Sequence, residues 1–310
     1  MGAFDRSIAL TEEKYVNTTT VARNVRRRLV TALAAVAIAL GVGAVAAPAA
    51  TAAPSGWWTW DAPGWGWEKT RWEGVWYTSP YGQHLVPDNF HEFDDEHAAY
   101  GGGGGRLGYP TSGVRQQTWG PISAGGYWQT FERGTIYGSF EGTHTLLNGS
   151  GITQHFNRIG GGSSAVGYPA APEVQEAPGW WYREFSNGYV FASRNGVHAV
   201  AGQLATEHKY QGGGSGLGYP TAPRRQDAPG FGYQTFERGV VYCTPYTQSR
   251  ENCKTVRGGF LRLHAQYGGG TGRLGYPTGN QFYYSGDGSW NQSFERGFVE
   301  IFNNGRVRIS

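Results

Sequence analysis

The sequence is poor in cysteine, methionine and charge: its 310 residues include two Cys and one Met, and 16% are charged. The first 52 residues hold six of the 26 Lys and Arg and three of the 23 Asp and Glu, so the remaining chain has 20 residues of each sign. A protein that binds the phosphate backbone of a nucleic acid concentrates basic residues on one face. The neutral composition of residues 53–310 therefore argues against nucleic acid as a partner.

The chain also lacks the common catalytic signatures, with no Gly-x-Ser-x-Gly elbow, no His-Glu-x-x-His helix and no phosphate-binding loop. The one dense polar cluster spans residues 91–97, where a helix would place His91, Asp94 and Asp95 on one side. We interpret it as a solvated helix; a metal site or the paired carboxylates of a secreted hydrolase are the alternatives. We therefore expect a protein that is not an enzyme, with no cofactor and no metal ion.

The first 52 residues have the order of a secretory signal. Basic residues at 26–28 precede an uncharged run at 29–47, and small residues stand at 50 and 52. An uncleaved membrane anchor is the alternative, because the run is near the lower limit for crossing a bilayer. The paired arginines fit both the general and the twin-arginine export route. We expect a leader at 1–52, an exported domain at 53–310, and membrane contact only through an uncleaved leader.

Cys243 and Cys253 bracket a polar stretch at 244–252. In an exported chain this pair predicts one disulfide, closing a loop of about 11 residues and contributing roughly 3 kcal/mol at most. A metal site with two cysteines is the alternative, but it lacks partners at ligand spacing.

A tetrapeptide recurs along the chain, three times as Leu-Gly-Tyr-Pro and once as Val-Gly-Tyr-Pro. A glycine cluster precedes each copy at a similar offset. A flexible linker would have no reason to do so, and we interpret these glycines as parts of a fixed turn. The copies are Leu107, Gly108, Tyr109 and Pro110; Val166, Gly167, Tyr168 and Pro169; Leu217, Gly218, Tyr219 and Pro220; and Leu274, Gly275, Tyr276 and Pro277.

A second signature, Phe-x-x-Gly, follows each tetrapeptide and has aromatic and β-branched residues around a short polar turn. This pattern predicts a β-hairpin. A degenerate fifth hairpin, around residues 72–74, precedes the first tetrapeptide. A further short strand follows each hairpin, and apolar residues at Ile152, Phe156 and Ile159 predict a turn or two of helix after it.

The sequence thus predicts a mainly β fold with short helical turns. It would comprise five pseudo-repeated units, at about 57–115, 116–172, 173–222, 223–279 and 280–310. Such units cannot bury their faces alone, so their neighbours must cover them. Neither end shows a distinct polar capping unit, which favours a closed, propeller-like ring; an open β-solenoid is the alternative. Because side chains alternate along a strand, Ile136 is expected on the inner face and Tyr137 on the opposite face.

Aromatic side chains are the first candidates for ligand contacts, because they stack on sugar rings while nearby polar groups bond to hydroxyls. Arginines in the hairpin turns are the second set, since weak sites repeated on a rigid frame gain from effective concentration. Packing between units and solvated surface charge are the respective alternatives. The aromatic candidates are Trp67, Trp128, Tyr137, Tyr182, Phe191, Tyr233 and Tyr242, and the arginine candidates are Arg133, Arg238 and Arg296.

The tetrapeptides and their surroundings resemble the LGFP repeat of exported actinobacterial cell-envelope proteins, with Tyr where Phe is usual. The resemblance covers about residues 57–310. In that family the repeats accompany mycolyltransferases and peptidoglycan amidases and are associated with holding them to the envelope, so the resemblance implies wall association by a non-catalytic module. The acidic residues that the family carries soon after the Pro are mostly missing here; only Glu173 is in place.

We therefore expect a monomeric protein, secreted or in the cell wall, that binds wall polysaccharide. The polymer would be peptidoglycan or arabinogalactan, held at the repeated aromatic and polar sites. A secreted wall hydrolase is one alternative. A structural surface scaffold that recruits an envelope enzyme as its partner is the other.

Overall fold

The computed structural model describes residues 59–70, 73–88, 92–117, 125–247 and 250–310. They belong to one compact unit, Ala53–Ser310. The leader lies outside the described residues, so its cleavage and its alternative as an anchor stay predictions. Within the described ranges, no helix is both long enough and apolar enough to cross a membrane.

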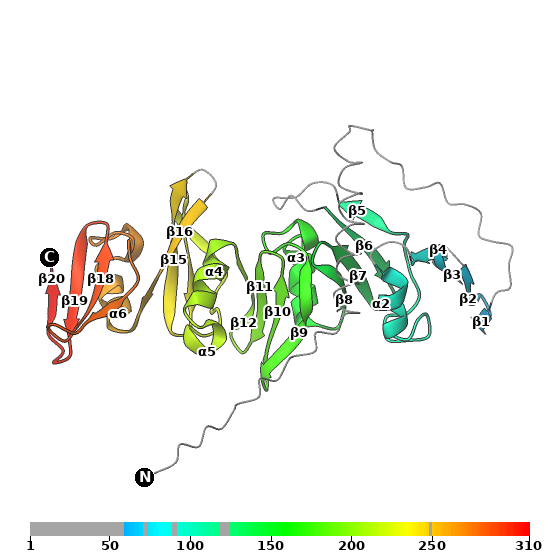
Figure 1. The fold of residues 1–310 in the computed structure, drawn as a ribbon, viewed down its shortest axis with the longest axis horizontal. Helices are drawn as coiled ribbons and strands as arrows, with labels where there is room; N and C mark the ends of the chain where they lie inside the picture. The colour runs from blue at the N-terminus through cyan, green and yellow to red at the C-terminus, as the bar shows by residue number, and fades with distance from the viewer. Residues whose placement is uncertain (1–58, 71–72, 89–91, 118–124, 248–249) are drawn as a thin grey trace, which may run out of the picture. The chain divides into compact units, whose positions relative to one another are not determined.

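The described chain forms five antiparallel sheets of four strands each, and each sheet is a meander in chain order (Figure 1). We number them sheets 1 to 5. The mainly β prediction is confirmed. Sheet 1 has β1 (Thr59–Ala62), β2 (Trp65–Thr70), β3 (Gly74–Ser79) and β4 (Gly82–Pro87); sheet 2 has β5 (Arg115–Gln117), β6 (Gly126–Phe131), β7 (Gly134–Ser139) and β8 (Gly142–Leu147). Sheet 3 has β9 (Pro169–Ala177), β10 (Trp180–Phe185), β11 (Gly188–Ser193) and β12 (Gly196–Ala201); sheet 4 has β13 (Arg225–Ala228), β14 (Phe231–Phe236), β15 (Gly239–Thr247) and β16 (Arg250–Arg257); sheet 5 has β17 (Phe282–Tyr284), β18 (Ser289–Phe294), β19 (Gly297–Phe302) and β20 (Val307–Ile309).

A short helix follows each of the first four sheets and precedes a glycine-rich turn and a tetrapeptide. The predicted helical turns after β8 are confirmed: α3 begins where Ser150 Oγ accepts hydrogen bonds from the backbone N–H groups of Ile152 and Thr153, and it buries Ile152 and Phe156. The helices are α2 (Phe93–Ala99), α3 (Gly151–Arg158), α4 (Gln203–Tyr210) and α6 (Gly258–Gln266); the turns include η1 (Gly161–Ser163), α5 (Gly213–Gly216) and η2 (Gly269–Thr271).

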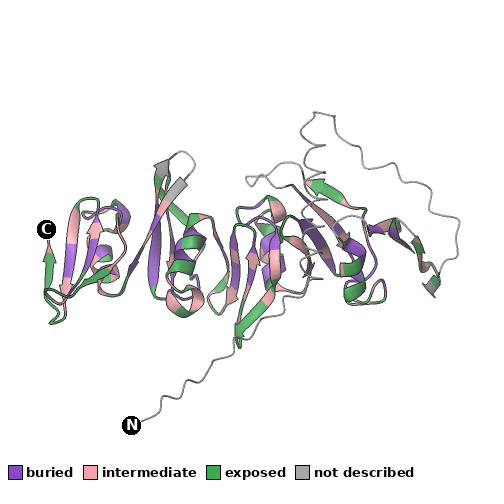
Figure 2. Ribbon diagram, in the orientation of Figure 1, coloured by how far each residue is buried: buried purple, intermediate pink, exposed green. Residues whose placement is uncertain are grey.

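Buried residues lie in the strands of every sheet (Figure 2), and alternation along the strands divides each inner sheet between two hydrophobic clusters. Ile136 packs with residues of sheet 1, whereas its neighbour Tyr137 packs with residues of sheet 3, which confirms the expected opposite orientation. We call these clusters the first to fourth interfaces, in chain order. Their buried apolar residues include Tyr77, Val86, Phe93, Leu107, Phe131 and Ile136 (first); Tyr137, Leu146, Phe156, Val166, Phe185 and Val190 (second); Phe191, Leu204, Leu217, Phe236 and Val241 (third); and Tyr242, Val256, Phe260, Leu274, Phe294 and Val299 (fourth).

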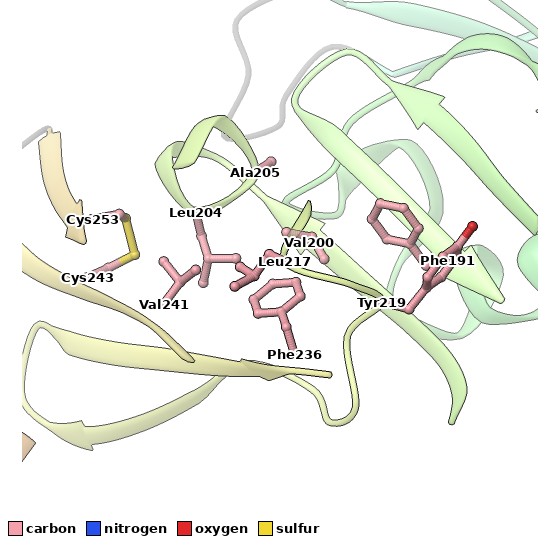
Figure 3. Packing of buried hydrophobic residues seen from close by; sticks show 10 residues of the cluster. All are labelled: Phe191, Val200, Leu204, Ala205, Leu217, Tyr219, Phe236, Val241, Cys243 and Cys253. Atoms are coloured by element: carbon pink, nitrogen blue, oxygen red, sulfur yellow. A yellow bond between two sulfur atoms is a disulfide. The ribbon is translucent and has the colours of Figure 1, made fainter. Parts of the chain in front are cut away.

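The third interface shows how one cluster is assembled (Figure 3). Leu204 from α4, Leu217 from the tetrapeptide and Phe236 from the hairpin meet on the buried side of β15 and β16. The predicted disulfide joins Cys243 to Cys253, which lie directly opposite each other on these two strands. The disulfide therefore belongs to the core and fixes the longest hairpin.

A ring from each helix packs on the Phe of the following hairpin. The His208 ring centroid lies 4.7 Å from that of Phe236, and His208 Nε2 donates a hydrogen bond at 2.8 Å to the carbonyl of Gly218. His97 and His264 make the same contacts in the first and fourth interfaces. The second interface has Phe156 in this place, 4.8 Å from Phe185.

Buried polar side chains also tie each sheet to the one before it. Gln129 is fully buried, and its Nε2 donates to the carbonyls of Leu85, on the last strand of sheet 1, and Ser112, both at 2.9 Å. Gln234 and Gln292 repeat this arrangement, and Arg183 donates to Thr145 O in the second interface. A buried carbonyl without a hydrogen bond would destabilise the fold. Because these side chains bond to carbonyls of the preceding sheet, they fix adjacent sheets relative to one another.

The last sheet differs from the others on its outer face. Where the other sheets have aromatic pairs, Asn291 lies opposite Glu300, and Glu300 lies opposite Arg308, to which it is ion-paired. The expectation that neither end carries a polar cap stays a prediction: Asn291 and Glu300 are buried, whereas Phe282, Tyr284 and Trp290 of the same sheet are exposed. All five sheets are open, so the closed ring is not confirmed.

Candidate functional site

The two repeated signatures bind each other. In the third interface, the N–H groups of Glu237 and Arg238 donate to the carbonyls of Tyr219 and Leu217 at 3.1 and 3.0 Å, and Tyr219 N donates to Glu237 Oε2 at 3.3 Å. Gly218 makes this approach possible: its φ is +89°, and a Cβ there would lie 2.7 Å from the Glu237 side chain. The second interface substitutes Ser186 Oγ, which accepts from Tyr168 N at 3.1 Å.

Each of the three arginine candidates holds the glycine turn of the preceding unit. Nη2 of Arg238 donates to the carbonyls of Gly214 and Ser215, each at 2.7 Å. Arg133 Nε donates to Arg106 O at 3.0 Å, and Arg296 Nη2 to Gly272 O at 2.7 Å. The hairpin-turn charges thus have structural partners, which corrects the interpretation of these turns as merely solvated charge.

Each tetrapeptide tyrosine is buried and bonds through its hydroxyl to the first strand of the preceding sheet. Burial raises the pKa of Tyr168 to about 12, so the hydroxyl stays protonated and donates. This bond gives Tyr a reason to stand where the family has Phe. The pairs are Tyr109 with Asp61, Tyr168 with Gln117 at 2.9 Å, Tyr219 with Glu176, and Tyr276 with Asp227 at 2.7 Å.

The aromatic candidates fall into two groups. Tyr137, Phe191 and Tyr242 are buried in the second, third and fourth interfaces, where Tyr168, Tyr219 and Tyr276 pack on them with ring centroids 6.1, 5.4 and 6.0 Å apart. All three serve the core, and Tyr137 also reaches the lining of a groove. The half-buried group comprises Trp67, Trp128, Tyr182 and Tyr233 on the first hairpin strands.

Two candidates, Trp128 and Tyr137, come together in a groove of about 650 Å³ beside the second interface. They are cross-strand partners on β6 and β7, so their rings belong to the same face of sheet 2. Polar groups complete the wall: the described lining consists of these two rings with Gln116, Gln117, Asn157, Gly160, Gly161, Gly162 and Ser163. A second hollow, of about 470 Å³, is lined by residues 226–230 of one hairpin turn and holds no aromatic ring.

The groove is uncharged along its described lining and is partly fixed by hydrogen bonds. Gln116 Nε2 donates to Tyr127 Oη at 2.8 Å, and Gln117 Nε2 donates to Ser163 Oγ. Burial raises the pKa of Tyr137 to about 12, so its phenol is neutral at physiological pH. The site therefore offers the half-buried Trp128 ring, the edge of Tyr137 and amide groups to a neutral ligand.

The sequence interpretation missed the amides and the glycine turn of this groove, because they come from three separate segments. No local pattern in the sequence pointed to them, since Gln116, Asn157 and Ser163 meet only in the fold.

The acidic helix α2 is present, but its description as solvated is wrong for two residues. Asp94 is 5% exposed and pairs with Lys69 Nζ at 3.6 Å, and His97 is 1% exposed. Burial raises the pKa of Asp94, and the nearby Asp88 and Asp95 raise it further. Asp95 is exposed, His91 lies outside the described residues, and within the described ranges no three His, Cys, Asp or Glu residues are grouped to hold a metal ion.

Glu173, the acidic residue that the family resemblance singles out, contacts a helix end. Its Oε2 accepts a hydrogen bond from Ser150 Oγ at 2.6 Å, and the same Ser150 oxygen caps α3. A carboxylate near a helix N-terminus is favourable. Glu173 therefore has a structural role in the second interface.

The model of the LGFP repeat matches residues 217–272, from the third tetrapeptide to the glycine turn at η2. This segment is an LGFP repeat. The LGFP repeat here comprises the tetrapeptide, the four strands of sheet 4, the helix α6 and that turn, and the other tetrapeptides make equivalent contacts. The chain is thus a repeat protein in which one copy matches the LGFP repeat.

No curated protein matches the chain. A solved structure with some likeness is described as the extracellular domain of a one-component system of B. thetaiotaomicron. The alignment has 11% identity and a TM-score of 0.16, and it covers 82% of this chain and 30% of that one. At this score the likeness bears on neither fold nor function.

Proposed function

We propose that the chain is an exported, non-catalytic module that binds cell-wall polysaccharide in the groove beside the second interface. The observation that carries the proposal is the convergence of Trp128 and Tyr137 with the exposed amide of Asn157 in one hollow. Aromatic faces pack on the C–H groups of a sugar ring, and amides both donate to and accept from its hydroxyls. The repeated sites of the sequence prediction are thereby narrowed to one groove.

The charge of the groove supports a neutral glycan as its ligand. A polyanion would call for Lys or Arg at the contact, and the arginine candidates Arg133, Arg238 and Arg296 are bonded to glycine turns instead. The described lining has amides, hydroxyls and ring faces only. These groups match a polysaccharide segment without charged substituents.

Export is supported by two features. The Cys243–Cys253 disulfide persists in oxidising compartments outside the cytosol, and residues 217–272 are a repeat of the cell-surface type. The monomeric state and an envelope enzyme as a partner stay predictions.

The proposal is tested by sedimentation of the full chain with deproteinised cell wall. We expect the wild-type protein to sediment with the wall, and Trp128→Ala to weaken binding at least tenfold, because it removes the stacking face. The matched control is Trp181→Ala, since Trp181 is 36% exposed on β10 and lies outside the groove lining. Recovery of the wild-type protein in the supernatant would contradict the proposal, and so would equal losses for both variants.

Two further measurements separate the alternatives. Zymography on the same wall material tests a hydrolase: clearing that is lost in Asp94→Asn would contradict a non-catalytic module. Retention on native wall but not on deproteinised wall would favour a scaffold that binds a protein partner.

A further inference from the structure

Sheet 5 has a cluster of exposed aromatic rings on its first two strands. Four of the ten large apolar side chains that are exposed among the described residues lie within residues 282–290. They are Phe282, Tyr283, Tyr284 and Trp290, with exposed fractions between 44% and 56%. Single exposed apolar side chains are normal on a protein surface, whereas a group of them rimmed by polar residues marks an interaction site.

Tyr283 and Trp290 form a pair that we call the sheet 5 platform. They are cross-strand partners on β17 and β18, so their rings lie on the same face, with centroids 5.4 Å apart and ring planes at 53°. Asn303 Nδ2 donates to Tyr283 Oη at 3.2 Å, and Asn303 N donates to the carbonyl of Gly288 at 3.1 Å. The turn after β19 therefore holds the Tyr283 ring in place, and a ligand would meet a surface that is already ordered.

Packing within the chain does not account for the platform. Ile301, the cross-strand neighbour of Trp290 on β19, packs in the fourth interface, but neither platform ring belongs to that cluster. In sheets 2, 3 and 4 the residue at the place of Tyr283 is a glutamine, opposite the second residue of the first hairpin strand. These residues are Gln116, Gln175 and Gln226. Sheet 5 thus has a second ring where these sheets have an amide.

We infer that the sheet 5 platform is a second contact for the wall polysaccharide, where one uncharged pyranose ring stacks on Trp290 with Tyr283 along its edge. The inference rests on the proposed function and adds to it a site outside the groove. The C–H groups on the face of a pyranose pack on an aromatic ring, and the hydroxyls on its rim can bond to the phenol of Tyr283 and the exposed amide of Asn303. A polymer of repeated sugars presents such rings at many positions, so two weak contacts on one chain raise the apparent affinity.

Size and charge favour a sugar over a protein as the occupant. A stable protein interface takes roughly 20–30 residues on each side, whereas the platform consists of two rings and an amide. Charged groups of the adjoining turns have partners of their own: Asp287 Oδ1 accepts from Ser289 N at 3.1 Å and from Ser289 Oγ at 2.6 Å, and the Arg306 guanidinium lies 4.3 Å from the centroid of the Phe302 ring. The platform therefore suits a small, uncharged ligand unit.

The test is sedimentation of the full chain with deproteinised cell wall, comparing Trp290→Ala with Trp181→Ala. Trp181 is a matched control because it has the same place in its hairpin strand and is 36% exposed, but lies opposite Gln175. We expect Trp290→Ala to weaken wall binding at least about threefold by removing one of two linked contacts, and Trp181→Ala to bind as wild type does. Trp290→Phe keeps a ring face and should retain most of the binding.

Near-UV circular dichroism checks that Trp290→Ala is folded, and Tyr283→Ala provides a second variant with the same expected loss. Wall binding by folded Trp290→Ala equal to that of wild type would overturn the inference. A wild-type dimer that Trp290→Ala converts to a monomer, measured by light scattering, would also overturn it, because the face would then bind a second copy of the chain.

The two proposals fail differently. If the wild-type protein does not sediment with deproteinised wall, the proposed function fails. If it sediments, Trp128→Ala loses binding and Trp290→Ala does not, then only the inference about the sheet 5 platform is overturned. If Trp290→Ala loses binding and Trp128→Ala does not, the groove is wrong and the platform stands.

Discussion

The second and third interfaces share the same arrangement of strands, helix and tetrapeptide, but they differ in the residues at equivalent positions. Where the third has Glu237 and Arg238 on its tetrapeptide, the second has Ser186 and Asn187, and both pairs hydrogen-bond the same stretch of backbone. Changes inside the frame are thus compensated by other partners. At Gly126, where three other hairpins begin with an aromatic residue, the Tyr168 ring lies over the backbone. Differences between copies therefore preserve the packing of the frame, and the groove lined by Trp128 and Asn157 lies beside the second interface.

The largest expected effect is a loss of stability, and it tests whether the tetrapeptides of the second and third interfaces are equivalent. Leu217 and Val166 are both fully buried at the same place in their interfaces. Leu217→Ala should lower the free energy of unfolding by about 3 kcal/mol and Val166→Ala by about 2 kcal/mol, since each leaves a cavity that scales with the removed volume. Urea denaturation of each variant measures the losses. A loss below about 1 kcal/mol at Leu217 would contradict its place in the core.

The disulfide is the next test, because only the third of these two interfaces contains one. Reduction, or the double substitution Cys243→Ala and Cys253→Ala, should lower the free energy of unfolding by about 3 kcal/mol, because the unfolded chain gains conformational entropy when the cross-link is absent. Hydrogen exchange should rise most in β15 and β16. Sheet 2 provides the internal comparison, and an equal rise in β7 and β8 would show that the disulfide does not act locally.

Lowering the pH should destabilise the interfaces that contain a buried helix histidine, whereas the second interface has Phe156 in this place. Burial lowers the pKa of His97 to about 4, so the folded chain keeps this ring neutral. Between the unfolded pKa near 6.5 and the folded value, the unfolded chain binds a proton that the folded chain does not, so stability falls as the pH falls through this window. His97→Phe introduces the residue that the second interface has at Phe156. The variant should lose about 2 kcal/mol less unfolding free energy than wild type between pH 7 and pH 4.5.

Thermal unfolding across that pH range checks the histidine prediction. At pH 7 the variant loses the hydrogen bond to Gly108 and should be slightly less stable than wild type. An unchanged dependence on pH would show that His97 does not carry the acid sensitivity.

The smallest expected effect concerns the glycine turns. Arg238→Ala removes bonds to several turn carbonyls and should cost about 1 kcal/mol, whereas Asn187→Ala removes one bond, to Ala165, and should cost about half as much. Chemical denaturation gives both values. If Arg238→Ala weakened wall binding without lowering stability, its assignment as a structural residue would be wrong.

Local patterns predicted the fold well. The hairpin at Phe236, the helix around Phe156 and the opposite orientation of Ile136 and Tyr137 depend on turn chemistry and on side-chain alternation, which act over a few residues. The disulfide was also predicted, because Cys243 and Cys253 are the only cysteines.

The candidate site was predicted only in part. Trp128 was identified by residue type, but the same argument also selected Tyr137, Phe191 and Tyr242, on each of which the next tetrapeptide tyrosine packs. Whether an aromatic ring is open or covered depends on a segment of the following sheet. Alternation along its own strand does not decide it.

The sequence by itself determined a repeated, mainly β protein with five hairpin units, since periodicity and turn residues act locally. Only the tertiary structure decided which charges hold glycine turns, that Glu300 pairs with Arg308 in sheet 5, and that Trp128 and Asn157 line one groove. The physical reason is distance along the chain: contacts such as that between Tyr168 and Gln117 join residues 51 positions apart, and burial is a property of both partners.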